Sequence, residues 1–214
     1  MTDDDASSPT HHQENPMTHL QSAASPTGTA QSPGARRVLG RWMLSFAGYP
    51  LGGYAAYLLV GRVDSPGPAV AGGLLTGAVL GAVQAWAIGR PLPRPVAWIL
   101  ATAVGLMTGV AAGAALVDYR TDLGSLVIQG AVTGALVGAA QAAVLAPRLG
   151  SLSLVWPMFL AGTFAVGWAV TTSAGIDVDL QFTVFGSSGA LTATLLTAVL
   201  PVVLNRVHTA ERAS

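Results

Sequence analysis

The sequence predicts an all-α membrane protein with six transmembrane helices. Between Arg41 and Arg206 the charged residues are confined to five short clusters. Only 9% of the 214 residues are charged, whereas a soluble domain usually carries about 25%. Each uncharged run is about 20 residues or longer, and an α-helix of that length crosses about 30 Å of hydrocarbon. The six uncharged, mostly apolar runs are 42–61, 65–89, 95–117, 123–147, 149–176 and 180–205.

The expected organisation has three parts. Residues 1–35 are rich in Ser, Thr, Pro and Gln. They hold too little apolar surface to offset the entropy lost on ordering, so a disordered cytoplasmic tail is expected. A membrane domain is expected over 36–207 and a second cytoplasmic tail over 208–214. Arg36 and Arg37 are compatible with a twin-arginine signal, but the long first run without a small-residue cleavage site favours a retained span. The expected spans are 42–61, 69–89, 96–117, 124–146, 154–174 and 182–204.

Arginine placement predicts a plasma-membrane protein with both termini in the cytoplasm. In that topology eight of the ten arginines lie on the cytoplasmic side, where short loops are enriched in basic residues. The opposite side holds five aspartates with Arg62 and Arg120. Four tryptophans are then expected at the inner headgroup level: Trp42, Trp86, Trp98 and Trp156.

The second and fourth spans are near copies of each other. Residues 73–85 read GLLTGAVLGAVQA, and residues 130–142, which lie 57 positions further along, read GAVTGALVGAAQA. The odd spans echo one another through their tryptophans, and the sixth span matches more weakly. We therefore predict three parallel two-helix repeats related by an axis along the membrane normal. Three repeats form either a pseudo-threefold bundle or a row of hairpins, and closure is favoured because a row exposes more small-residue faces to lipid.

The repeated stripe supplies the candidate functional residues. Glycines four apart lie on one helical face, and the glutamine that follows returns to the same stripe. Such stripes let membrane helices approach closely, and an amide on them bonds a neighbouring helix. The alternative is a polar ring near the bundle axis, completed by Thr197, that contacts a permeating solute. The candidate helix-packing or pore-lining residues are Gly73, Gly77, Gly81, Gln84, Gly130, Gly134, Gly138, Gln141 and Thr197.

Two further features have a functional and a simpler interpretation. Pro50 predicts a kink in the first span, which is either a broken helix at a transport site or only a matter of shape. The aspartate pairs Asp118 with Asp122 and Asp177 with Asp179 could offer carboxylates to a hard cation. Solvated loop charges are the simpler interpretation of both pairs.

Composition excludes several classes of protein. Without cysteine there is no disulfide or thiolate chemistry, and zero net charge argues against nucleic acid as a partner. The predicted spans contain no Asp, Glu, Arg or His, which proton-coupled transporters and membrane enzymes would use. No catalytic, cofactor or metal site is predicted. The sequence favours a non-enzymatic structural or partner-binding subunit with the bilayer and a membrane protein as partners. A passive channel or carrier for a small solute or ion is the alternative, and a membrane enzyme ranks third.

The repeated stripe, the loop Gly-Arg-Pro-Leu-Pro-Arg-Pro at 89–95 and Trp98 resemble a group of uncharacterised bacterial multi-pass membrane proteins. The resemblance covers mainly residues 70–170. In that group the glutamine is commonly followed by tryptophan, whereas here alanine follows both Gln84 and Gln141. The resemblance implies the same hairpin-repeat fold, and it transfers no activity and no site residue.

Overall fold

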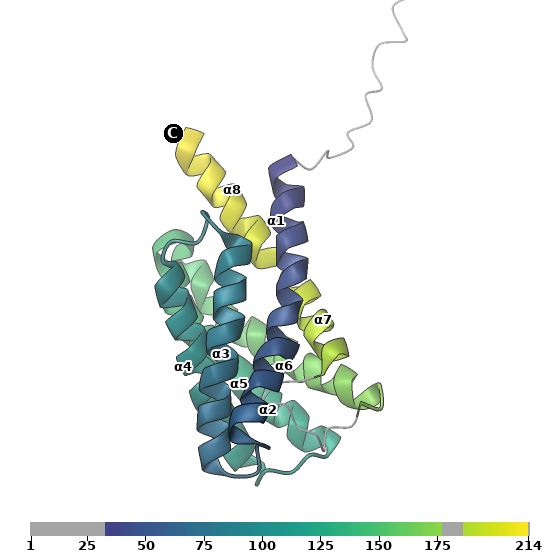
Figure 1. Ribbon diagram of the computed structural model, residues 1–214. Coiled ribbons are helices and arrows are strands. Elements are labelled where there is room, and N and C mark those ends of the chain that lie inside the picture. Colours follow the sequence, from purple (N-terminus) through teal and green to yellow (C-terminus); the bar gives the residue numbers. More distant parts are fainter. Residues whose placement is uncertain (1–32, 177–185, 214) are drawn as a thin grey trace, which may run out of the picture. The chain divides into compact units, whose positions relative to one another are not determined.

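The computed structural model describes residues 33–176 and 186–213, and the regular secondary structure of this part is helical (Figure 1). Five helical segments are long and apolar enough to cross a membrane: Arg36–Val60, Pro66–Ile88, Pro95–Leu116, Leu123–Ser173 and Ser187–Ala213. The helices are α1 (Pro33–Leu44), η1 (Ser45–Ala47), α2 (Gly48–Val60), α3 (Pro66–Ile88), α4 (Pro95–Leu116), α5 (Leu123–Leu149), η2 (Gly150–Val155), α6 (Trp156–Ser173), α7 (Ser187–Thr197) and α8 (Val199–Ala213).

The boundaries differ from the expected ones mainly at the two ends of the chain. Helix α1 begins at Pro33, so residues 33–35, expected in the disordered tail, form its first turn; proline is favoured there because its missing N–H is not needed. Residues 1–32 lie outside the described residues. Helix α8 continues to Ala213, so residues 208–213, expected as a tail, are helical.

The expected fourth and fifth spans belong to one helical segment of 51 residues, Leu123–Ser173. Within it, α5 and α6 are joined by the 3₁₀ segment η2 with no non-helical residue between them. Gly150 reverses the chain at this point with φ +54°, a conformation that is unstrained for glycine. Helices α5 and α6 then pack against each other along their lengths.

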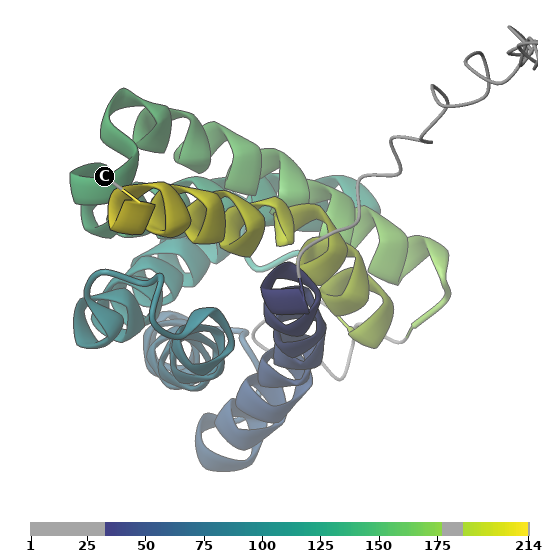
Figure 2. The ribbon, with the colours of Figure 1, turned by 90° about the horizontal axis from the view of Figure 1, so that it is seen from above.

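Helices adjacent in the sequence lie side by side. Helix α3 packs between α2 and α4, α5 packs between α4 and α6, and α6 contacts α7. Helix α7 in turn contacts α1, η1 and α2, and α8 contacts α1. The last helices of the chain thereby meet the first ones, as the view along the bundle shows (Figure 2).

Two prolines interrupt the regular hydrogen bonding of the first and last segments. Pro50 has no N–H for the carbonyl of Phe46, and the predicted irregularity takes the form of η1. Pro201 likewise has no N–H for the carbonyl of Thr197, the residue at which α7 ends. The Ala198 N–H bonds the Leu195 carbonyl at 3.2 Å. Helix α8 then leaves the line of α7 and crosses the end of the bundle toward the turn between α5 and α6 (Figures 1 and 2).

The turn between α4 and α5 explains one of the two aspartate pairs. Asp118 has φ +53° in the turn, and Asp122 caps α5 by accepting from the Ser125 N–H at 3.0 Å and from Ser125 Oγ at 2.6 Å. These two bonds, the hydroxyl bond first, lower the pKa of the Asp122 carboxyl. The Asp122 carboxylate, which was a candidate cation ligand, is thus engaged in helix capping. Asp177 and Asp179 lie outside the described residues.

Candidate functional site

The glycines of the two stripes lie at contacts between neighbouring helices. A Cβ added at Gly73 would lie 2.7 Å from the Leu106 carbonyl oxygen, and one at Gly77 would lie 2.6 Å from Ala103 Cα, both on α4. Gly81 faces the α4 backbone in the same way. Absence of a side chain therefore lets α3 approach the backbone of α4 directly, which is how small residues promote helix packing in membranes.

The fourth-span stripe packs α5 on α6. A Cβ at Gly130 would lie 2.8 Å from the Phe164 carbonyl oxygen, and one at Gly138 would lie 2.5 Å from Pro157 Cα. At Gly134 the added carbon would collide with the carbonyl group of Leu160. The candidate glycines thus lie at contacts between helices.

Three of the four tryptophans expected at the inner headgroup level are covered by neighbouring helices. Trp42, Trp98 and Trp156 are only 1%, 0% and 8% exposed, whereas Trp86 is 54% exposed. Their depth in the membrane stays a prediction, but their rings face the inside of the bundle. An indole buried among apolar groups needs an acceptor for its N–H, because an unpaired buried donor is costly.

Each of these three indoles finds its acceptor on another helix. Trp98 Nε1 donates to Gln84 Oε1 at 3.3 Å, which joins α4 to α3. Trp156 Nε1 donates to Gln141 Oε1 at 2.9 Å, which joins α6 to α5. Trp42 Nε1 donates to the backbone carbonyl of a residue on α7, Thr194, at 3.0 Å. The candidate glutamines are therefore acceptors for tryptophans that sequence reasoning assigned to the interface.

Gln141 also bonds with its other end. Its Nε2 donates to Thr102 Oγ1 on α4 at 2.9 Å, and Thr102 Oγ1 donates to the Trp98 carbonyl at 2.8 Å. One amide thus spans α4, α5 and α6, and the bonds form a continuous network from Gln84 to Trp156. Thr102 was missed because a single threonine in an apolar helix carries no distinguishing signal.

Thr197, predicted to complete the polar ring, does not accept an indole. Thr197 Oγ1 donates to the Ala193 carbonyl of its own helix at 2.6 Å. The carbonyl of Thr194 accepts the indole instead, because the Ala198 N–H, its partner in a regular α-helix, bonds Leu195. The helix break ahead of Pro201 therefore creates the acceptor.

The predicted polar residues do meet at the centre. Gln84, Gln141 and Thr197 line one cavity of about 10 Å³. That volume is close to the minimum for a single water molecule. Three buried tryptophans, Trp42, Trp98 and Trp156, line the same cavity, and the last two bond Gln84 and Gln141. In this conformation the cavity leaves no room for a larger solute.

Comparison of the chain with known protein families, curated proteins and solved structures finds no match. Its chemistry is therefore inferred from its own residues. Amide, hydroxyl and indole groups are neutral hydrogen-bonding groups, and a hydroxyl without an adjacent base is a weak nucleophile. The arrangement suits the fixing of helices against one another.

Replacing Gly134 by alanine is expected to destabilise the bundle by roughly 1–3 kcal/mol, because the added carbon overpacks the contact with α6. The measurement is equilibrium unfolding of the full chain in detergent micelles. Gly162→Ala is the matched control, since nothing lies within 4 Å of a Cβ at Gly162, and it is expected to be neutral or slightly stabilising. Equal stability of the two variants would contradict the packing role.

Replacing Gln141 by leucine is expected to destabilise the chain by roughly 1–3 kcal/mol, because Trp156 Nε1 loses its acceptor. The same unfolding measurement is made on Trp156→Phe and on the double variant. Both single changes remove the bond between Trp156 and Gln141. The double variant should therefore lose less stability than the two single variants lose in sum. Strict additivity would show that the amide and the indole are not coupled.

Proposed function

We propose that this chain is a six-span integral protein of the plasma membrane that acts as a non-enzymatic structural or partner-binding subunit. The supporting observation is the use of its central polar groups: Gln84 and Gln141 bond other helices around a cavity of about 10 Å³. Hydrogen bonds of this kind hold helices together where lipid offers no competing partner. A transport pathway would instead leave such groups facing open space.

Exposed apolar side chains support the membrane placement. Leu59, Leu116, Leu154 and Met158 are between 66% and 75% exposed on the described helices. Large apolar side chains are exposed on each of the five long helical segments, and exposed apolar surface on this scale indicates contact with protein or lipid. In hydrocarbon the same side chains carry no penalty, and the polar groups are kept inside.

The antiparallel pairing of α5 and α6 supports six crossings. Helix α5 has 27 residues and α6 has 18, so their lengths are about 40 Å and about 27 Å at 1.5 Å per residue. Helix α5 is thus longer than the hydrocarbon core, which is about 30 Å thick, and α6 is close to that thickness. The 51-residue segment Leu123–Ser173 would then cross twice and return the chain to its starting side.

The three indole bonds support closure into a pseudo-threefold bundle. Trp98 and Trp156 each join the start of one proposed repeat to the end of the preceding one. Trp42, at the start of the first repeat, bonds α7 in the last. The same interaction therefore recurs at all three proposed interfaces between repeats.

Single-cysteine labelling tests the topology, because the natural chain has no cysteine and hence no background. With six crossings and cytoplasmic termini, Ser151→Cys and Ala213→Cys should react with a membrane-impermeant maleimide only from the cytoplasmic side. Thr121→Cys should react only from outside. Labelling of Ser151→Cys from outside would refute the arrangement.

Reconstitution tests the subunit role against the channel alternative, which the meeting of Gln84, Gln141 and Thr197 at the centre favours. Proteoliposomes of the full chain are expected to release a small neutral solute or a monovalent ion no faster than protein-free vesicles. Flux that rises with protein density, and that changes in a Gln84→Leu/Gln141→Leu variant, would overturn the proposal in favour of a passive channel.

A further inference from the structure

A larger pocket, of about 440 Å³, lies where α1, the turn between α3 and α4, and α8 meet. Three arginines from these separate elements line it: Arg41, Arg90 and Arg212. Asn205, His208 and Thr209 add polar groups, and Val38, Ile88 and Pro91 add an apolar wall. The lining thus combines three positive charges with hydrogen-bonding groups and apolar surface, and it contains no carboxylate.

Arg41 is held in place by neutral groups. Its guanidinium carbon lies 4.6 Å from the centroid of the Trp86 ring, and its Nη2 donates to the Trp86 carbonyl oxygen. Gly89 has φ +66°, a conformation that favours glycine, and it lies next to the Arg41 guanidinium. A cation–π contact positions the charge without neutralising it. Among the described residues, Arg41 Nε is buried and has no hydrogen-bond partner.

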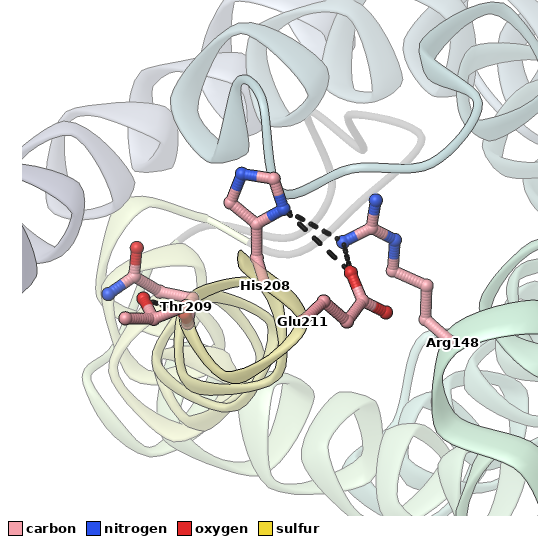
Figure 3. A network of polar contacts seen from close by, with 5 residues as sticks. Arg148, His208, Thr209 and Glu211 are labelled. Atoms are coloured by element: carbon pink, nitrogen blue, oxygen red, sulfur yellow. Dashed lines mark hydrogen bonds and ion pairs between the residues drawn. The ribbon is translucent and has the colours of Figure 1, made fainter. Parts of the chain in front are cut away.

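Helix α8 is fixed over the bundle end by a separate network. Glu211 Oε2 lies 3.1 Å from Arg148 Nη1, and the same nitrogen lies 3.2 Å from His208 Nδ1. Figure 3 shows Glu211 and His208 of α8 directed toward Arg148 of α5. The carboxylate of Glu211, which precedes Arg212 in the sequence, is thereby directed toward Arg148. Within the described ranges, the two ion pairs join Glu211 to Arg148 and to His208, and neither includes the three arginines of the pocket.

We propose that this pocket binds the phosphate group of an anionic ligand, and that an anionic phospholipid supplies it. Guanidinium groups match phosphate oxygens in geometry and charge. The pocket lies beside the exposed ring of Trp86, which belongs at the level of the headgroups. Basic pockets between membrane helices on the cytoplasmic side bind anionic headgroups, and the apolar wall suits the start of the acyl chains. This binding site goes beyond the subunit role and does not depend on it.

Native mass spectrometry of the purified full chain in neutral detergent tests the site. Phosphatidylglycerol is added in one arm, phosphatidylcholine in a second, and inorganic phosphate in a third, alone and in competition with phosphatidylglycerol. We expect one phosphatidylglycerol to bind in preference to phosphatidylcholine. The Arg90→Gln/Arg212→Gln variant should bind it about 25-fold more weakly, since each arginine near an anionic surface contributes roughly fivefold.

A matched control separates the pocket from overall charge. Arg94→Gln/Arg206→Gln also removes two positive charges, one from the turn between α3 and α4 and one from α8. Both arginines lie outside the pocket lining, so this variant should retain wild-type binding. Phosphate that binds alone and displaces the lipid, with the same dependence on variant, would identify free phosphate as the source and support the phosphate site. Equal loss in both double variants would overturn the proposal, as would equal binding of the two lipids with no effect of phosphate.

Discussion

The arrangement of this chain depends on the cost of an unpaired hydrogen-bond donor in an apolar interior. An indole N–H buried without a partner is strongly disfavoured. The indoles of Trp98 and Trp156 each reach a side-chain acceptor on a neighbouring helix, and a glutamine supplies it in each case. Because hydrophobic attraction between helices is absent in lipid, such bonds and the glycine contacts decide which helices are neighbours.

The sequence predicts the long helices because charge and hydropathy, the properties that mark a membrane-spanning helix, belong to single residues. The position of each helix and the glycine face of α3 or α5 follow from spacing alone. The tryptophans were placed by depth from the interfacial tendency of indole, which does not reveal the specific acceptor that a buried N–H needs. Trp98 and Trp156 lie 14 and 15 residues after Gln84 and Gln141. That nearly constant interval was the signal that could have paired them across a short turn.

The basic pocket could not be predicted from the sequence for a different reason. Arg41, Arg90 and Arg212 come from three separate parts of the chain, and each alone is explained as a cytoplasmic loop charge. Their convergence requires α8 to cross the bundle end, which depends on the helix break ahead of Pro201 and on the pairing of Arg148 with Glu211. Neither the direction of a break nor a contact across the bundle is encoded by local spacing.

The same break also accounts for the weak similarity of the last helix to its predicted counterparts. A glutamine is not needed there, because the break frees the Thr194 carbonyl to accept the indole of Trp42. A backbone carbonyl accepts an indole N–H as well as an amide oxygen does. The hydrogen bond of the indole is therefore kept although no glutamine side chain accepts it. Similarity of sequence is therefore a poor measure of similarity of contact in this chain, and the residue that matters in the last helical segment is Pro201, which has no N–H to donate.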